Sequence, residues 1–369
     1  MTNELSALRS KIPLTLVSLA AAVILIAGLR AAQALVVPFM LALFFAIIAA
    51  PLVNWLQSKR VPAAVAVLLV VIVLLSVLTI VGVVLGGTVN RFVAAIPQYQ
   101  ARLDALVNSI PSLIDRLPIE LEIDDREILG IIDPGSVMSW VGSGLKGLAA
   151  ILSNTFMISL IVVFMLLEGV WVPTKLKVAF GEDSKAVLQV DHAATQIQRY
   201  LAVKTIVSLS TGALVAIWTS VLGLDFALLW GLLAFLLNFI PTIGSLLAAV
   251  PAVLLALIQL GPGSALAVGL GFLVVNVLFG NIIEPNVIGR TLGLSTLVVF
   301  LSLVFWGWVL GPVGMLLSVP LTMIIKIILE SSEKTRPIAI MLDNGRAVAA
   351  RIQLEEEAAA VAEDANSAG

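Results

Sequence analysis

The sequence predicts an all-α polytopic membrane protein with about eight hydrophobic membrane segments, two of them broken by proline and glycine. Apolar residues make up 60% of the 369 residues and charged residues 12%, whereas a soluble domain is about half apolar and a quarter charged. The mean hydropathy is +1.12. The two breaks share one pattern, IPTIGSLLAAVP at 240–251 and LGPVGMLLSVP at 310–320. Such paired breaks indicate a transporter, because backbone leaves the regular helix at membrane depth only where protein buries it or where it lines a cavity.

Composition and motifs exclude several other classes of function. The net charge of −2 provides no basic footprint for nucleic acid. The chain has no cysteine, so it has no disulfide framework, no thiol nucleophile and no thiolate metal site. No GxxxxGK[ST] motif and no nucleophile–base constellation occurs, so we expect neither ATP-driven transport by this chain nor an enzyme, and no cofactor or metal. The single histidine, His192, is most simply a solvated helix residue.

The N-terminal region, 1–89, contains three apolar runs. The first, 12–28, follows a basic start, which is also the pattern of a secretory signal. This run is longer than the usual signal core, and a second run, 34–53, follows almost at once. We therefore expect a hairpin of two spans here, with a third span at 61–89.

Segment 90–147 is far more polar and is expected to be an extracytoplasmic amphipathic helical segment. Apolar residues recur there at alternating spacings of four and three, which is the coiled-coil pattern. Pro97 and Pro111 interrupt it, which argues against a straight coiled coil. Two interpretations stay open: the seam joins subunits, or the helix packs on its own chain. Residues 119–124, IELEID, alternate as a short half-buried strand would. The seam consists of Phe92, Ile96, Tyr99, Leu103, Leu106, Ile110, Leu113 and Leu117.

The transport core is expected at 148–330. Span four occupies 148–167, and span five ends near Gly223. Between them, 168–204 carries several basic residues and is expected to be a cytoplasmic amphipathic linker. Beyond the core, 331–369 is expected to be a cytoplasmic tail with a frayed or disordered acidic end.

Three topologies fit the apolar stretches after Asp225: ten crossings, eight crossings with two long broken helices, or two hairpins. Several stretches are too short to cross the ~30 Å hydrocarbon core, which needs about 20 helical residues. We favour the third topology, in which 225–260 is a hairpin entering from outside, 264–283 is a full span and 293–329 is a hairpin entering from inside. The two hairpins then form an inverted repeat, as in many secondary transporters.

Positive charge near span ends marks the cytoplasmic side. Basic residues before the first run, Lys59 with Arg60, and the cluster at 175–204 should all be inside. Both termini are then cytoplasmic, and 90–147 lies outside. Lys326, in the last apolar turn, should snorkel to the cytoplasmic interface.

Polar residues at membrane depth are costly and are therefore candidates for function. A broken helix also exposes free backbone N–H and C=O groups. Asn281 and Glu284 should lie on nearly one helix face. In the alternative interpretation, the asparagines cap helices or bond between them, and Glu284 pairs with Arg290. The substrate-path candidates are Asn238, Pro241, Thr242, Gly244, Ser245, Asn276, Asn281, Glu284, Gly311, Pro312 and Gly314.

Three stretches carry a resemblance to a known family: QRYLAVKTIVSLSTG (198–212), LGLDFALLWGLLAFLLNFIPTIGSLLAAVPA (222–252) and NIIEPNVIGRTLGLSTLVVFLSLVFWGWVLGPVGMLLSVPLT (281–322). They resemble the autoinducer-2 exporter family of bacterial multi-pass permeases, and the likeness covers roughly residues 12–330. The last stretch is especially close to the quorum-signal branch, although Thr291 stands where a small residue such as glycine is expected.

The resemblance implies export of autoinducer-2, a small and very polar furanose-derived signal, across the bacterial inner membrane. It also suggests a homo-oligomer, for which we expect a pentamer. We expect an alternating-access, elevator-like exporter whose two hairpin tips face a common site. Some relatives are described as sodium/proton antiporters, which makes Glu284 an ion-coupling candidate and gives the second hypothesis. A non-transporting scaffold assembled through 90–147 is the third, but a scaffold has no reason to keep irregular backbone at membrane depth.

Overall fold

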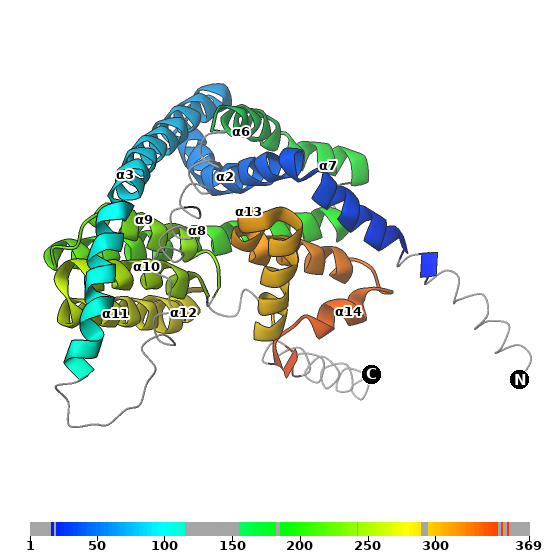
Figure 1. Ribbon diagram of the computed structural model, residues 1–369. Coiled ribbons are helices and arrows are strands. Elements are labelled where there is room, and N and C mark those ends of the chain that lie inside the picture. Colours follow the sequence, from blue (N-terminus) through cyan, green and yellow to red (C-terminus); the bar gives the residue numbers. More distant parts are fainter. Residues whose placement is uncertain are drawn as a thin grey trace, which may run out of the picture.

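The computed structural model describes residues 16–17, 20–114, 143, 155–181, 185–241, 243–288, 294–345, 348–349 and 353. These residues are almost entirely helical, and an isolated antiparallel bridge joins Leu294 to Asp343. The elements are α2 (Gln33–Ser58), α3 (Ala63–Ile114), α6 (Thr155–Gly169), α7 (Val172–Phe180), α8 (Lys185–Val221), α9 (Ala227–Leu237), α10 (Ile243–Leu260), α11 (Pro262–Asn276), the π-helix η1 (Val277–Ile283), α12 (Glu284–Ile288), α13 (Thr296–Glu330) and α14 (Arg336–Met341) (Figure 1).

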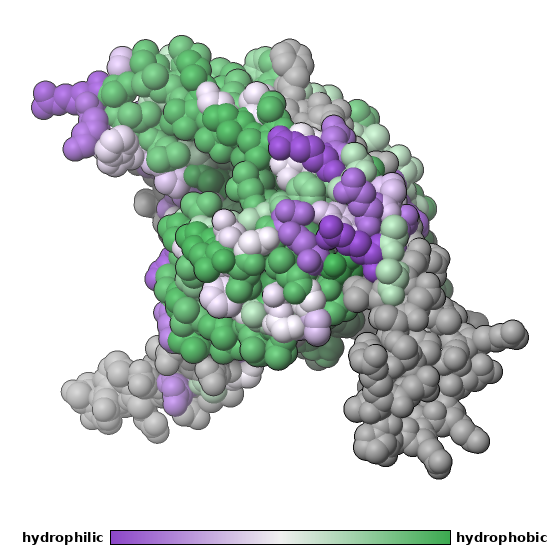
Figure 2. Space-filling model, turned by 60° about the vertical axis from the view of Figure 1, so that its left-hand side comes forward, coloured by the Kyte–Doolittle hydropathy of each residue, from purple (hydrophilic) through white to green (hydrophobic). Residues whose placement is uncertain are grey.

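Six helices in the described residues are long and apolar enough to cross a membrane, or seven if α6 and α7, bent by 50°, form one span. Apolar side chains cover much of the face seen in Figure 2, and hydrophilic residues gather in a few patches. A soluble protein rarely exposes so large a continuous apolar surface. The chain is therefore an all-α, multi-pass membrane protein, which confirms the fold class predicted from its sequence.

The first two apolar runs do not form the expected hairpin. Backbone hydrogen bonds of helical spacing run from Ala32 N to Gly28 O (2.9 Å) and from Val36 N to Ala32 O (3.0 Å). A single turn residue, Ala32 (φ −88°, ψ 12°), therefore separates the helix at 20–31 from α2, which leaves no loop for a hairpin. The physical reason is local: residues 29–35, LRAAQAL, contain no proline or glycine, and alanine is the strongest helix former.

Helix α3 packs part of the predicted seam inside its own chain. Phe92 and Tyr99 are buried in a core that also contains residues of α9 and α10, and Ile96 packs against it. The Phe92 ring meets the rings of Phe226 and Trp230 edge-on, at centroid distances of 5.5 and 5.7 Å. These contacts favour the intrachain interpretation for the first part of the seam. The side chains of the later seam residues, and the predicted strand at 119–124, lie outside the described residues.

The first broken segment is a hairpin, termed hairpin 1, made of α9, a tip that includes 238–241, and α10. The Gln259 side chain at the end of α10 accepts a hydrogen bond from Asp225 N (3.0 Å) and donates one to Gly223 O (3.2 Å), next to the start of α9. The two ends of the hairpin are therefore side by side. Residues 225–260 thus fold back on themselves as predicted, whereas their entry from outside the membrane stays a prediction.

The second broken segment, hairpin 2, is α13 folded back on itself at Gly311, whose φ of 68° and ψ of −152° are not helical. Trp306 Nε1 donates to Thr322 Oγ1 (3.2 Å) across sixteen positions of sequence. A straight helix would separate those residues by about 24 Å. Residues 293–329 therefore fold back on themselves at Gly311, as the broken-segment pattern predicted. The choice among the three topologies, which differ in where the chain enters the membrane, stays a prediction.

Helix α8 connects two packed halves of the molecule (Figure 1). One core joins hairpin 1 and α11 to the second half of α3. Another joins α2, α6 and the first half of α3 to residues of hairpin 2. A third cluster places Leu201 of α8 against Met323 of α13 and Phe44 of α2. The middle of α8 therefore lies where the two halves meet.

Candidate functional site

The site is built on α8, which begins earlier than the sequence suggested. Residues 168–204 were expected to be a linker, but α8 starts at Lys185 and its membrane-candidate part is Ala194–Val221. No proline or glycine occurs between 185 and 211 to end a helix. Lys204 is consequently a buried residue inside the span, 4% exposed, rather than a charge at its edge.

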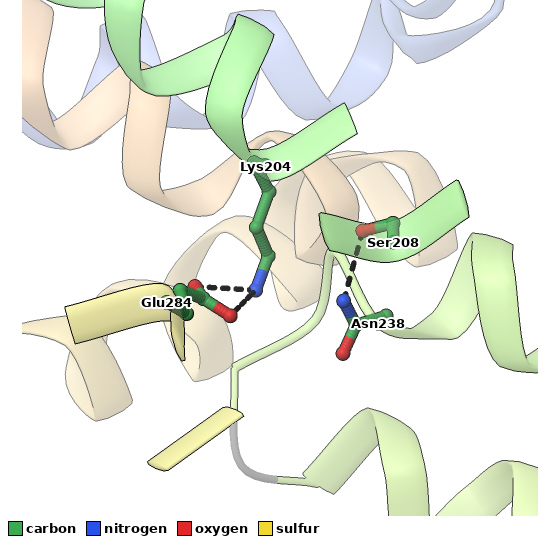
Figure 3. A network of polar contacts seen from close by, with 4 residues as sticks. All are labelled: Lys204, Ser208, Asn238 and Glu284. Atoms are coloured by element: carbon green, nitrogen blue, oxygen red, sulfur yellow. Dashed lines mark hydrogen bonds and ion pairs between the residues drawn. The ribbon is translucent and has the colours of Figure 1, made fainter. Parts of the chain in front are cut away.

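Lys204 forms an ion pair with Glu284 (Figure 3). The ammonium lies 2.7 Å from Oε1 and 2.8 Å from Oε2 of the carboxylate, and the two side chains are 5% and 18% exposed. A charge buried without a partner costs several kcal/mol, so the pair explains how both charges are tolerated here. Glu284 was expected to pair with Arg290, which lies outside the described residues.

The π-helix η1 determines which way Glu284 points. Its hydrogen bonds close i→i+5 rings, and Glu284 N still bonds to Phe279 O at its end. Each residue therefore turns the chain by roughly 80° instead of 100°. The prediction that Asn281 and Glu284 share nearly one face assumed the α-helical angle and is wrong: Asn281 is exposed, whereas Glu284 faces α8.

Asn238, at the tip of hairpin 1, contacts the same face of α8. Its Nδ2 donates to Ser208 Oγ at 2.9 Å, and both residues are buried. Ser208 follows Lys204 by one helical turn, so the two polar pairs lie side by side, and Asn238 Oδ1 points away from Ser208 (Figure 3). Asn238 thus makes the interhelical bond that one of the two interpretations anticipated.

Glycines permit the tight fold of both hairpins. A Cβ on Gly244 would lie 1.8 Å from Leu237 O, and a Cβ on Gly314 would lie 1.9 Å from Trp306 O. In each case the second arm rests directly on a backbone carbonyl of the first. The matching glycine pattern of the sequence therefore reflects one packing requirement that both hairpins share.

The two tips do not meet in this structure. Phe239 of hairpin 1 packs edge-on against Phe44 of α2, with ring centroids 5.6 Å apart. At hairpin 2, a Cβ on Gly311 would lie 3.0 Å from Gln33 Nε2, at the beginning of α2. The two contacts on α2 are about three turns, or ~16 Å, apart. Asn238 and Glu284 thus meet at one place on α8, whereas the Gly311 tip lies beside the start of α2.

The remaining candidates are distributed around this centre. Ser245 and Asn276 line a mostly apolar groove of about 530 Å³ between α10 and α11. Pro312 lines a separate pocket of about 510 Å³ beside Arg30 and Gln33. Pro241 is half-buried at the tip of hairpin 1, and Thr242 lies outside the described residues.

Sequence reasoning missed Lys204 and Ser208 as site residues. Lys204 is the only charged residue between Tyr200 and Asp225. A lone lysine within an apolar stretch indicates a buried, paired charge, and this signal was available. The positive-inside rule instead assigned Lys204 to the cytoplasmic edge of the span.

Comparisons with known proteins agree with this geometry. The sequence profile of the family described as "AI-2E family transporter" matches residues 19–334. The chain is 40% identical over 322 residues to the AI-2 transport protein TqsA of Escherichia coli K12, covering 87% of this chain and 93% of that protein. It is 40% identical over 333 residues to a putative transport protein of Haemophilus influenzae, covering 89% and 95%. It is also 39% identical over 332 residues to the putative transport protein YhhT of Escherichia coli K12, covering 90% and 94%.

Proposed function

The chain belongs to the AI-2E transporter family, and from this premise we propose that it is a secondary transporter exporting a small polar solute across the bacterial inner membrane, with autoinducer-2 as the specific candidate. The name of the TqsA relative supports the choice of solute. The paired hairpins support a transport role, since irregular backbone at membrane depth occurs only where protein buries it or where it lines a cavity.

The observation that carries the proposal is a largely buried polar cluster, in which Lys204 and Ser208 on adjacent turns of α8 bind Glu284 of α12 and Asn238 of the hairpin 1 tip. The positive charge of Lys204 and the negative charge of Glu284 cancel, so the cluster has no net charge. Hydrogen bonds in such a site suit an uncharged solute that carries hydroxyl groups. A typical hydrogen bond contributes about 1 kcal/mol net, so a solute held by several of them still dissociates.

We base the mechanism on an elevator-like motion of hairpin 1 with α8. A Cβ on Gly212 of α8 would lie 2.6 Å from Gly231 O of α9, so backbone rests on backbone and the two helices should move together. Phe239 meets α2 through aromatic edges, a contact without hydrogen bonds that sliding can replace. The polar cluster would then be carried past α2, opening alternately to each side.

The test is efflux of autoinducer-2 from proteoliposomes. Asn238→Leu and Ser208→Ala should each lower efflux strongly, because a buried polar partner of the solute is lost. Lys175→Met serves as the control, since Lys175 pairs with Glu168 on an exposed surface. Undiminished efflux by both site variants would refute the proposed site.

The Lys204–Glu284 pair supports a second candidate, a cation/proton antiporter. A carboxylate next to an ammonium can exchange its partner for a metal cation when the chain moves. Glu284→Gln distinguishes the two functions. Autoinducer-2 efflux that survives while its dependence on a proton gradient disappears would give Glu284 an ion-coupling role in the exporter. A sodium-driven pH change that is lost in Glu284→Gln, in a chain that carries no autoinducer-2, would favour the antiporter.

A further inference from the structure

Thr211, on α8, has a buried hydroxyl whose hydrogen-bonding capacity is unused. The residue is 6% exposed, and its Oγ1 has no hydrogen-bond partner within the described part of the chain. Most buried polar side-chain atoms have a partner. A hydroxyl left without one costs about 1–3 kcal/mol. Such an atom calls for an explanation.

Other threonines of α8 show what Thr211 could have done. Thr205 Oγ1 donates to Leu201 O at 2.7 Å, and Thr219 Oγ1 donates to Val215 O at 2.8 Å. This bond to the carbonyl one turn earlier is the usual solution for a threonine inside a helix. In this structure the Thr211 hydroxyl forms no such bond and is closed to solvent, so only a molecule that enters between the helices can bond to it.

The position of Thr211 links it to the candidate site. Lys204, Ser208 and Thr211 follow one another at spacings of four and three, which places them on one face of α8. Lys204 and Ser208 bind Glu284 and Asn238 on that face. Lys204, Ser208 and Thr211 thus form one polar stripe along α8. Thr211 is the member whose side chain has no partner in the described part of the chain.

The contacts on either side show what Thr211 faces. Lys204 pairs with Glu284 at the start of α12, and Trp218 Nε1 donates to Ala267 O of α11 at 3.1 Å. Thr211 lies midway between Lys204 and Trp218. From these two contacts we infer that the segment opposite Thr211 is the junction of α11 with the π-helix η1, at Asn276–Val277. Single π-turns inside α-helices are frequently found at functional sites.

We propose that the Thr211 hydroxyl is a solute-binding group that determines specificity for uncharged, polyhydroxylated solutes. This inference rests on the proposed function and deepens it. A hydroxyl both donates and accepts, so it can bond to a sugar-like hydroxyl in either sense. The charges of Lys204 and Glu284 cancel each other, so this face of α8 offers hydrogen bonds to a solute without carrying a net charge.

The test compares Thr211→Val with Thr219→Val in the full-length protein. Valine keeps the shape of threonine but removes the hydroxyl. We expect Thr211→Val to raise the concentration of autoinducer-2 for half-maximal efflux by roughly fivefold, as loss of one hydrogen bond would. Its melting temperature without solute should be unchanged or higher, because no protein bond is lost. Thr219→Val should lower the melting temperature slightly and leave efflux unchanged, and Thr211→Ser should restore affinity.

The outcomes separate this inference from the proposed function. If Thr211→Val leaves half-maximal efflux unchanged while Asn238→Leu impairs transport, the function stands and the role of Thr211 is refuted. If neither variant affects transport, the site itself is refuted. If the parent chain does not carry autoinducer-2, the same comparison uses the uncharged polyol that raises its melting temperature most. A parent chain that no polyol stabilises would overturn the proposal.

Discussion

The Lys204 ammonium lies 2.7 Å from Oε1 of Glu284, and this ion pair joins the middle of α8 to the helix that follows η1. The two residues are 80 positions apart in the sequence. Both side chains are largely buried, so each charge would be strongly destabilising without the other. Adjacent to this pair, Asn238 binds Ser208, so hairpin 1 and α12 meet on one face of α8.

We predict that replacing one partner of the ion pair destabilises the chain more than replacing both. Lys204→Met or Glu284→Gln alone should cost about 3–5 kcal/mol, because one buried charge is left unpaired or poorly paired. The double variant should recover much of that loss. Melting temperatures of the purified protein in detergent measure the effect. Additive losses in the double variant would contradict the pairing.

Gly244 and Gly314 should be irreplaceable even by alanine. A Cβ at either position would overlap a backbone carbonyl of the opposite arm, at 1.8 and 1.9 Å respectively. Each alanine variant should therefore open its hairpin and abolish efflux from proteoliposomes. Gly263→Ala is the control, because a Cβ there meets nothing within 4 Å. Full transport by the Gly244 and Gly314 variants would refute the tip geometry.

The hydrogen bond from Tyr99 Oη to Asp225 Oδ2, 2.9 Å long, should hold α3 against the base of hairpin 1. Tyr99→Phe removes that bond while keeping the buried ring. Because the acceptor is a carboxylate, we expect a loss of about 1.5–3 kcal/mol, seen as a lower melting temperature. Asp225→Asn retains an acceptor and should lose less. Equal losses in the two variants would show that the charge of Asp225, rather than its hydrogen bond, matters.

The predicted topology is tested by cysteine labelling. The parent chain has no cysteine, so only the introduced residues can react. Cysteines introduced at Ser109 and Lys334 should react with an impermeant reagent from opposite faces of intact cells, with Lys334 inside. Reaction of both from one face would overturn the proposed orientation. The ion pair of Lys326 with Asp343 marks where the tail docks on hairpin 2, and the expected position of Lys326 at the cytoplasmic interface stays a prediction.

Assembly through the second part of the seam stays a prediction. Leu103→Asp with Leu106→Asp should reduce the mass of the detergent-solubilised particle from a pentamer to smaller species, if those residues join subunits. The matched control is Ala105→Asp, between them on an exposed position. A mass that neither change alters would favour packing within one chain, as already seen for Phe92 and Tyr99.

The sequence by itself determined the features that depend on neighbouring residues. The apolar stretches predicted the membrane class, and the proline and glycine pattern predicted both hairpins, because helix breaking is a local property of the backbone. Asn238 and Glu284 were identified as site candidates because polar groups in an apolar stretch need partners. The same local reasoning failed at residues 29–35, where a polar interruption without proline or glycine leaves only one turn residue, Ala32, between two helices.

Only the tertiary structure decided which residues meet. Glu284 pairs with Lys204 because η1 turns less per residue than an α-helix, a change of angle that no apolar pattern reveals. The Gly311 tip lies against Gln33, away from the Asn238 tip, because each hairpin packs on a different turn of α2. Distances between elements depend on helix register and packing between side chains far apart in the sequence. Spacing along one segment therefore predicts the chemistry that a site offers, whereas packing determines where that chemistry is assembled.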